Sequence, residues 1–282
     1  SSIPLQTPPA DVFNYPEKVL QFGTGVLQRG LCDFYIDKAN RAGIFKGRVV
    51  VVKSTSKGGA DAFDEQDGLY THCIKGIEEG VAKEENIINS SISRTITASK
   101  DWDAILACAK SEDMQIVLSN TTEVGISYVA NDPIANGCPN SFPAKLLAFL
   151  HARFTHFQGS ASSGMVIVPT ELIINNGDKL KEIVLKLAAD HGLSADFVAW
   201  LNNANHFCNS LVDRIVPGSP DAATNAEICA QMGYEDSLMI ISEVYSLWAI
   251  QGGAKVKEVL SFALADKGVI IAEDIEIYRE LK

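Results

Sequence analysis

Two glycines between a predicted strand and a predicted helix form a turn that is suited to bind the phosphates of a dinucleotide. The apolar segment 18–22 ends at Gly23, Gly25 follows after one residue, and a helical pattern starts at Val26. In such a turn the first glycine permits the bend, the second lets the backbone approach the pyrophosphate, and the helix N-terminus supplies free N–H groups. Gln28 stands where a third glycine is usual, so taken alone the two glycines are also explained by ordinary turn chemistry. The strand–helix–strand context favours cofactor binding.

The end of the second predicted strand bears on which dinucleotide the turn would bind. Consecutive valines at 49–52 form this strand, and Lys53 and Ser54 follow it directly. NAD-binding sheets usually carry an acid here for the ribose 2′-hydroxyl, but the next acid is Asp61. A basic, hydroxylated segment would accommodate the 2′-phosphate of NADP, and a merely solvated loop has the same composition. NAD is expected from the fold, and NADP stays open.

Two further polar groups follow apolar segments, where open α/β sheets bind their ligands. Asn120 and Thr121 come directly after a predicted strand, and their amide and hydroxyl groups could hydrogen-bond the cofactor; a capped turn is the alternative. Asn209 lies close in sequence to Asp213 and Arg214. It could donate to a developing oxyanion while an Asp–Arg ion pair orients it, or that pair could be purely structural.

Other kinds of chemistry find no support in the residue spacing. The five histidines and six cysteines form no metal-binding pattern, no Cys-x-x-Cys pair occurs, and no Gly-x-Ser-x-Gly marks a hydrolase. With 24 Lys and Arg against 35 Asp and Glu, the net charge of −11 argues against a nucleic-acid or anionic-membrane partner. No apolar run approaches the roughly 20 residues of a membrane helix, and no signal peptide is visible in 1–9. We therefore expect a soluble, cytoplasmic protein with reduced thiols.

Alternating strands and helices position these candidate residues. The predicted strands are 18–22, 48–52, 115–119, 164–169 and 238–242, and the predicted helices are 26–40, 99–109 with Ser99 as its cap, 142–154, 178–191 capped by Asp178, and 195–205. We expect a polar helix or loop after Trp248. This alternation predicts an α/β fold: a doubly wound, Rossmann-like, mostly parallel sheet with helices on both faces.

Six motifs occur in an order that resembles one enzyme family. They are Phe22-Gly-Thr-Gly25, Gln66-Asp-Gly-Leu-Tyr-Thr71, Ser119-Asn-Thr-Thr-Glu123, Ser141-Phe-Pro-Ala-Lys-Leu146, Pro169-Thr-Glu-Leu-Ile173 with Asn176-Gly177, and Asn209-Ser-Leu-Val-Asp-Arg-Ile-Val-Pro217. Together they resemble the polyol-specific long-chain dehydrogenases, the mannitol dehydrogenase family. The motif sequences most resemble those of the tagaturonate reductase (altronate oxidoreductase) branch, and the resemblance spans 19–282.

The resemblance implies a metal-independent NAD(P) enzyme with a Rossmann-like N-terminal half and a helical C-terminal domain that completes the site. It implies hydride transfer between D-altronate and D-tagaturonate in hexuronate catabolism, so the expected partner is a small sugar acid or polyol. Lys282 falls on the family's general base, and Asn209 falls on an asparagine that holds the oxygen where charge develops. The cofactor-binding residues are expected to be Gly23, Thr24, Gly25, Val26, Ser54, Asn120 and Thr121.

The family's catalytic motif continues beyond the position of Lys282, where this sequence ends. We therefore expect 1–235 to be the dinucleotide-binding domain and 236–282 to be a final strand and a connection towards a helical domain absent from the sequence. A catalytic lysine needs a partly desolvated site to lower its pKa towards neutrality. This half alone is thus expected to bind NAD(H) weakly and to show little turnover.

Three alternative functions stay open at this point. A mannitol 2-dehydrogenase or a fructuronate reductase of the same family is possible, because most substrate-contacting residues of the family lie in the absent half. A non-catalytic, dinucleotide-binding regulatory domain would fit the missing third glycine. A purely structural α/β domain would require the order of the six motifs to be a coincidence.

Overall fold

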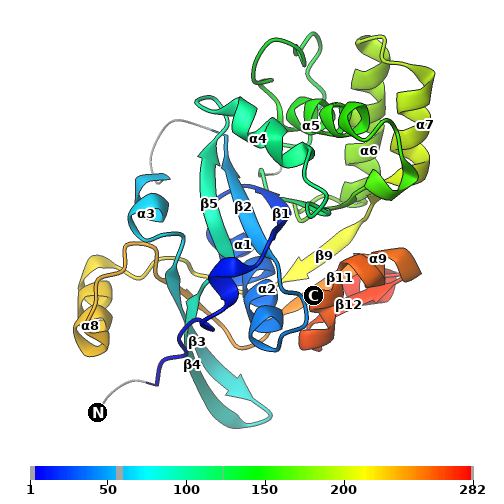
Figure 1. Cartoon of the computed structure of the whole chain (residues 1–282). Helices are drawn as coiled ribbons and strands as arrows, with labels where there is room; N and C mark the ends of the chain where they lie inside the picture. The colour runs from blue at the N-terminus through cyan, green and yellow to red at the C-terminus, as the bar shows by residue number, and fades with distance from the viewer. Residues whose placement is uncertain (1–3, 55–59, 123, 281–282) are drawn as a thin grey trace.

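A six-stranded parallel sheet forms the centre of the molecule in the computed structural model, which describes residues 4–54, 60–122 and 124–280 (Figure 1). Its strands are β1 (Glu17–Phe22), β2 (Arg48–Lys53), β5 (Ile92–Thr97), β6 (Ile116–Ser119), β7 (Val166–Pro169) and β8 (His206–Phe207). They lie in the order β5–β2–β1–β6–β7–β8, and all neighbouring pairs are parallel. Counted along the chain this is the order 3-2-1-4-5-6 of dinucleotide-binding sheets, which reverses its winding between β1 and β6. The predicted doubly wound, Rossmann-like sheet is confirmed.

Helices cover both faces of this sheet, as the sequence predicts. Leu20 and Phe22 point to one face and pack with α4 (Trp102–Ala109), α5 (Phe142–His156), α6 (Asn176–Asp190) and α7 (Ala195–Ala204). Val19 points to the opposite face and packs with α2 (Cys32–Arg41). Because both faces are covered, all six residues of β2 are buried.

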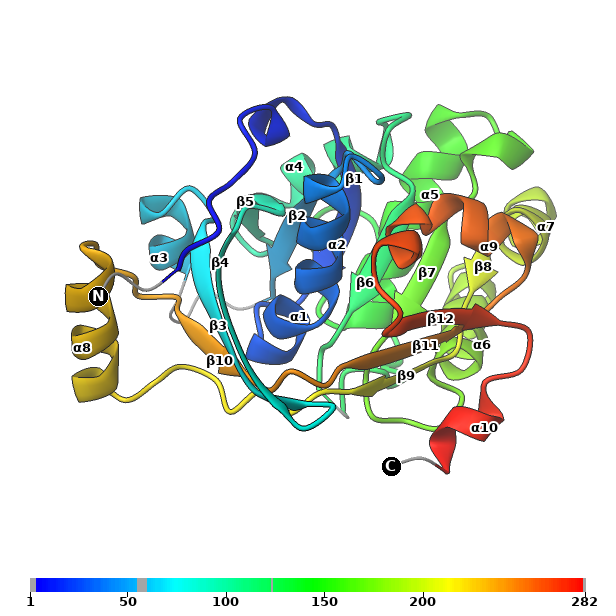
Figure 2. The same cartoon turned by 90° about the horizontal axis from the view of Figure 1, so that it is seen from below.

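Two three-stranded sheets flank the central one (Figure 2). In the first, β3 (Tyr70–Glu78) and β4 (Val81–Asn89) form a projecting antiparallel hairpin, and β10 (Ile240–Ser242) pairs in parallel with β3. The second joins β9 (Ser210–Asp213), β11 (Leu247–Gln251) and β12 (Val269–Ala272). It packs on α2, where the fully buried Trp248 stacks with Tyr35 at a centroid distance of 6.4 Å.

The remaining elements connect these sheets. They are α1 (Val26–Gly30), α3 (Ala60–Glu65), α8 (Ala222–Met232), α9 (Ala254–Val259), α10 (Glu276–Arg279) and the 3-10 helices η1 (Val12–Asn14), η2 (Ala161–Ser163) and η3 (Ser261–Ala265). Within the described residues, no helix combines the length and the apolar character needed to cross a bilayer.

The helix predicted for 26–40 is broken into α1 and α2 at Leu31, whose φ is −122° and ψ −75°. Side chains from distant strands cause the break by taking the carbonyl groups that a continuous helix would use. The hydroxyl of Tyr70 donates to the carbonyl of Arg29 at 2.7 Å, and the guanidinium of Arg214 donates to that of Gly30 at 2.8 Å. Helical periodicity predicts neither contact, because both partners lie far along the chain.

Two predicted helix caps are also wrong. Asp101, and not Ser99, caps α4, because its carboxylate accepts a hydrogen bond from the backbone N–H of Ala104. Helix α6 starts two residues before Asp178, since the fully buried side chain of Asn176 bonds to the backbones of β7 and β9 and thereby sets its start.

Several strands lie where the sequence suggests none. The hairpin β3–β4 and strand β5 were not predicted, because most of β4 is exposed and carries no apolar period. The stretch after Trp248, expected to be a polar helix or loop, contains β11, α9, β12 and α10. These strands are short and gain their partners from β9 and from each other.

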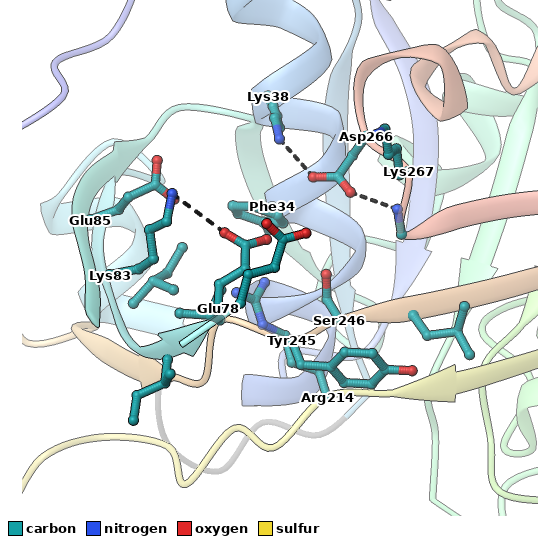
Figure 3. Close-up of a pocket in the computed structure, with 16 residues that line it drawn as sticks. Phe34, Lys38, Glu78, Lys83, Glu85, Arg214, Tyr245, Ser246, Asp266 and Lys267 are labelled. Carbon is teal, nitrogen blue, oxygen red and sulfur yellow. Dashed lines mark hydrogen bonds and ion pairs between the residues drawn. The ribbon is translucent and has the colours of Figure 1, made fainter. Parts of the chain in front are cut away.

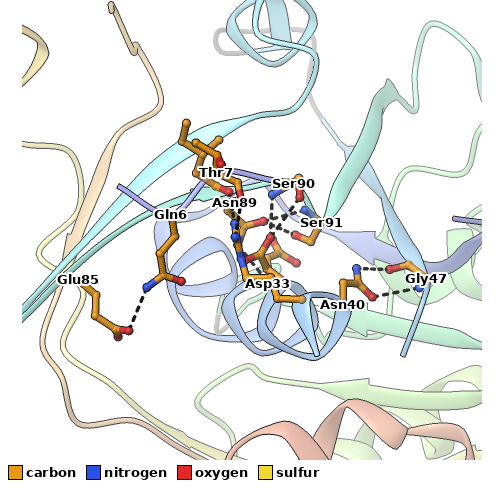
Figure 4. Close-up of polar contacts among 12 residues, drawn as sticks. Gln6, Thr7, Asp33, Asn40, Gly47, Glu85, Asn89, Ser90 and Ser91 are labelled. Atoms are coloured by element: carbon orange, nitrogen blue, oxygen red, sulfur yellow. Dashed lines mark hydrogen bonds and ion pairs between the residues drawn. The ribbon is translucent and has the colours of Figure 1, made fainter. Parts of the chain in front are cut away.

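A buried polar network ties α2 to the turn between β4 and β5 (Figure 4). Asn89 donates to the backbone carbonyl of Asp33 at 3.0 Å and accepts from the hydroxyl of Ser91 at 2.6 Å. The carboxyl group of Asp33 is fully buried and accepts from the side-chain amide of Gln21 at 3.0 Å. Among the described atoms, Oδ1 of Asp33 and Oε1 of Gln21 have no partner. Burial raises the pKa of Asp33 to about 7, and a proton on its carboxyl group would supply the donor that this pair lacks.

The raised pKa of Asp33 predicts a stability that declines as the pH rises. The folded state holds this proton more tightly than the unfolded state, so the stabilisation is complete below about pH 4 and is lost as the pH rises to about 7. Asp33→Asn keeps the shape, carries no charge and supplies an amide donor. We expect this variant to be more stable than the wild type at pH 8, by up to a few kcal/mol at about 1.4 kcal/mol per pKa unit, with a smaller difference at pH 5. Urea unfolding at both pH values measures it.

The exposed Asp113 provides the matched control, because Asp113→Asn removes the same charge from the surface. Its stability should follow that of the wild type at both pH values. A constant difference between Asp33→Asn and the wild type would show that Asp33 is ionised in the folded protein throughout this range.

Candidate functional site

The predicted glycine turn lies where the ends of β1 and β6 meet. Gly23 has a φ of 125°, and a Cβ atom there would lie 2.6 Å from the carbonyl oxygen of Asn120. Its N–H donates to the carbonyl of Val52 at 3.0 Å, which links the turn to β2 as well. Gly25 differs: its φ is −66°, it is the N-cap of α1, and a Cβ atom there would have no neighbour within 4 Å. The first glycine is therefore required by the fold, whereas the second leaves open space in front of α1.

Gln28, which replaces the usual third glycine, is a fully buried bridge across this junction. With its amide oriented to satisfy both atoms, it donates to the carbonyl of Gly23 at 3.0 Å and accepts from the N–H of Asn120 at 3.2 Å. The side chain thus joins the turn after β1 to the loop after β6. A long polar residue in place of the third glycine is the signal for this bridge in the sequence.

Glu171 fixes the other side of the same loop. It follows β7, is buried, and accepts hydrogen bonds from the Ser119 hydroxyl at 3.1 Å and from both the N–H and the hydroxyl of Thr121 at 3.0 Å. Burial raises the pKa of Glu171, and these hydrogen bonds act in the opposite direction. In the sequence Glu171 is only one residue of the motif 169–173. In the structure its hydrogen bonds hold the loop after β6, the predicted cofactor-binding loop, against the end of β7.

A cavity of about 430 Å³ opens beside the turn at this edge of the sheet. Its walls include Leu27 from α1, Asn120 and Thr122 after β6, and Glu171 and Leu172 after β7. A neighbouring cavity of about 220 Å³ shares Glu171 and Leu172 and extends towards β9 and α10. The larger of these two cavities lies next to the reversal between β1 and β6, where sheets of this topology bind their ligands, and the smaller one borders the segment after β7 and strand β9.

Asn209, the predicted oxyanion donor, precedes β9 and is buried. Its side-chain oxygen Oδ1 accepts from the N–H of Asp178 at 2.9 Å, so Asn209 stabilises the first turn of α6. Its amide group donates to the carboxylate of Asp178 at 3.0 Å and to Gln251 of β11 at 2.9 Å. Both amide hydrogens are therefore engaged within the protein, and the sequence contained no signal for the contact with Gln251.

The predicted ion pair between Asp213 and Arg214 is not formed. Arg214 donates instead to the carbonyls of Gly30 at 2.8 Å and Glu243 at 2.7 Å, and its guanidinium stacks on Phe34 at 4.5 Å from the ring centre. Neighbouring residues of an extended chain point to opposite sides, which separates the two side chains. Arg214 therefore fastens β9 to the junction between α1 and α2.

The other predicted residues are Ser54, Thr24, Val26 and Lys282. Ser54 is exposed directly after β2, at the carboxyl edge of the sheet. Lys282 lies outside the described residues. The turn residues Thr24 and Val26 are half-buried between Gly23 and α1.

A cavity of about 850 Å³ lies elsewhere, between the β3–β4 hairpin, α2 and the β9–β11–β12 sheet (Figure 3). Two ion pairs lie in its lining: Lys83 lies 3.6 Å from Glu78, and Lys38 lies 2.7 Å from Asp266. Because this cavity is not at the carboxyl edge of the parallel sheet, we place the candidate site at the glycine turn. Across the described part of the chain, no three His, Cys, Asp or Glu side chains are grouped to hold a metal ion.

The chain is similar to several known proteins. The family model described as the mannitol dehydrogenase Rossmann domain matches residues 17–261. Altronate oxidoreductase of Bacillus subtilis (strain 168) is 43% identical over 95% of this chain and 56% of its own length. The enzyme of the same name from Pectobacterium atrosepticum is 42% identical over 95% of the chain and 55% of its length. The resemblance predicted from the motifs is confirmed, and the chain spans about half the length of these relatives.

Solved structures show the same fold. A D-sorbitol dehydrogenase in substrate-free form superposes with a TM-score of 0.78 at 20% identity, covering 99% of this chain and 58% of that one. The mannitol 2-dehydrogenase of Pseudomonas fluorescens, in a ternary complex with NAD and D-mannitol, gives a TM-score of 0.76 at 21% identity, covering 99% and 57%.

The two glycines of the turn are expected to respond differently to the same substitution. Gly23→Ala should destabilise the protein by about 2–4 kcal/mol, because a positive φ and a clash with the Asn120 carbonyl act together. Gly25→Ala should change the stability by no more than about 1 kcal/mol, since it loses only a favourable N-cap. Urea unfolding of both variants measures the contrast; equal effects would contradict the close approach of β1 and β6.

Proposed function

The chain belongs to the mannitol dehydrogenase family, and on this premise we propose that it is the dinucleotide-binding half of an NAD-dependent oxidoreductase that interconverts D-altronate and D-tagaturonate. The observation that carries the proposal is the glycine turn at the reversal point of a 3-2-1-4-5-6 sheet, with a cavity beside it. Relatives named altronate oxidoreductase, 43% and 42% identical over 95% of the chain, support the choice of substrate.

The residues at the carboxyl edge suit a dinucleotide. Gly25 leaves the space that a pyrophosphate needs, and with Gly23, Thr24 and Val26 it would hold the phosphates at the start of α1. Beside the cavity, Asn120 and Thr121 would contact the nicotinamide half of the cofactor, and exposed Ser54 would contact the adenosine ribose. When bound, the nicotinamide ring supplies or takes up a hydride. The complex of mannitol 2-dehydrogenase, a protein of the same fold, with NAD supports NAD as the cofactor.

Two residues would handle the proton and the developing charge at the substrate. We assign Lys282 as the base that removes the hydroxyl proton during oxidation and Asn209 as a donor to the same oxygen. Because the amide of Asn209 bonds to Asp178 and Gln251, a substrate oxygen would replace one of these acceptors. The existing bonds hold the amide in a defined orientation before the substrate binds.

The division of labour along the chain follows from the same proposal. Residues 1–235 would bind the dinucleotide, and 236–282 would lead towards a helical domain that closes the substrate site. The six free cysteines, five of them buried, support a reducing compartment such as the cytoplasm.

Titration of the 282-residue chain with NAD and NADP tests the cofactor assignment. We expect weak binding of NAD, weaker binding of NADP, and a loss of roughly 10-fold or more in NAD affinity for Gly25→Ala, because its methyl group would occupy the space that the pyrophosphate approaches. Gly253→Ala is the matched control: Gly253 is also an N-cap glycine, a Cβ atom there would meet only the Glu273 carboxylate at 3.9 Å, and it precedes α9. Isothermal calorimetry measures all three proteins, and the absence of binding at millimolar NAD would refute the assignment.

A substrate panel tests the reaction. In a full-length protein that carries this chain, we expect kcat/KM to be highest for D-altronate, lower for D-mannonate and lowest for D-mannitol, measured from NADH absorbance. The 282-residue chain alone should show little or no turnover. Preference for D-mannitol or D-mannonate would assign the protein to another branch of the family, and full activity of the chain alone would contradict the half-enzyme interpretation.

A further inference from the structure

One cation lines the two cavities at the carboxyl edge of the sheet, and the proposed function gives it no role. Among the described residues that line these cavities, Arg279 is the single Lys, Arg or His, and Glu171 is the single acid. Arg279 lines the smaller cavity, and Glu171 stands where the two cavities meet. The site therefore carries its single positive side chain in the smaller cavity, at the end near α10.

Arg279 is held in place by the packing of its short helix. Helix α10 is attached to the β9–β11 sheet by Ile275, which is 2% exposed and packs with Leu211 and Ala249, while Tyr278 packs beside it. The guanidinium consequently borders the loop after β7, together with Leu172. It belongs to the last helix of the described chain and precedes the proposed base by three residues in the sequence.

The present partner of Arg279 is easily exchanged. Its Nε and Nη2 donate to the two carboxylate oxygens of Glu276 at 2.8 and 3.1 Å. The side chain of Glu276 is 61% exposed and that of Arg279 is 28% exposed, so water competes with this pair. In the described structure Nη1 donates to no protein atom, and a guanidinium has five N–H groups in a planar fork. A second carboxylate can therefore bind beside Glu276 or replace it.

We propose that Arg279 recognises the carboxylate of a sugar-acid substrate. The cavity of about 220 Å³ then takes the charged end of the substrate, and the cavity of about 430 Å³ takes its hydroxylated chain. This inference rests on the proposed function and adds to it the residue that selects sugar acids over uncharged polyols. Repulsion from Glu171 and a two-pronged bond to Arg279 act together on the carboxylate. Both would orient the substrate in one direction along the joined cavities.

The test compares two substrates that differ only in this group, D-altronate and D-altritol, with the full-length protein that carries this chain. For Arg279→Gln the ratio of kcat/KM for altronate to that for altritol should fall by about 10- to 100-fold, the value of a charge-assisted hydrogen bond. For Arg279→Lys this ratio should fall less, because lysine keeps the positive charge but loses the planar pair of N–H donors. Glu276→Gln should raise the ratio by up to about fivefold, since it removes the competing carboxylate.

Arg94 supplies a matched control. It forms the same two-pronged pair with Glu17, at 3.0 and 3.1 Å, but at the amino end of β1. Arg94→Gln should therefore leave the ratio unchanged. Dinucleotide titration and thermal unfolding of each variant confirm that the protein is folded.

The possible results separate this inference from the proposed function. If the wild type oxidises altronate and Arg279→Gln leaves the ratio unchanged, or lowers kcat/KM for both substrates equally, Arg279 does not recognise the carboxylate although the proposed function stands. If the wild type prefers altritol to altronate, both the proposed function and this inference fail.

Discussion

The ends of β1 and β6 approach so closely that a side chain at Gly23 would collide with the carbonyl of Asn120, and the candidate site depends on this contact. The approach follows from the strand order, because the sheet reverses its winding between these two strands and their loops leave in opposite directions. Gln28 bridges the two loops through its side-chain amide, which bonds to Gly23 and Asn120. Glu171 continues the connection from the loop after β6 to the end of β7. Three consecutive strand ends are thus held as one rigid edge.

Buried polar groups do much of this positioning, although each must give up its hydration. Gln28, Glu171 and Asn176 are nearly inaccessible to water, and each bonds to backbone atoms of a neighbouring strand end or loop. Such groups are costly when a partner is missing and specific when all partners are present. The Gln21–Asp33 pair shows the other outcome, since two of its oxygens have no donor and burial raises the pKa of Asp33. The main effect of Gln28, Glu171 and Asn176 is therefore to define one arrangement of the loops, and their contribution to stability is smaller.

The distribution of function over the molecule follows from the same architecture. The glycine turn and the cavity beside it belong to the central sheet, which is shared by the dehydrogenases with TM-scores of 0.78 and 0.76. Asn209 and Arg279 belong to the flanking sheet and to the helix attached to it. Strand β9 and helix α10 lie on the side of the molecule where the described chain ends (Figure 2). Under the proposed function, the central sheet would bind the cofactor and the flanking sheet would form the first part of the substrate site.

The sequence alone determined the alternation of strands and helices, the glycine turn after β1 and the family, because apolar runs, short motifs and helical periods are properties of neighbouring residues. It could not show that Gln28 bridges two loops, that Glu171 holds the loop after β6, or that Asn209 shares its amide with Gln251. Nor could it predict the break at Leu31, which side chains far along the chain impose. Arg214 contacts the carbonyl of Gly30 across 184 positions of the sequence. Such contacts exist only after the strands have assembled, so no local pattern records them and only the tertiary structure decides them.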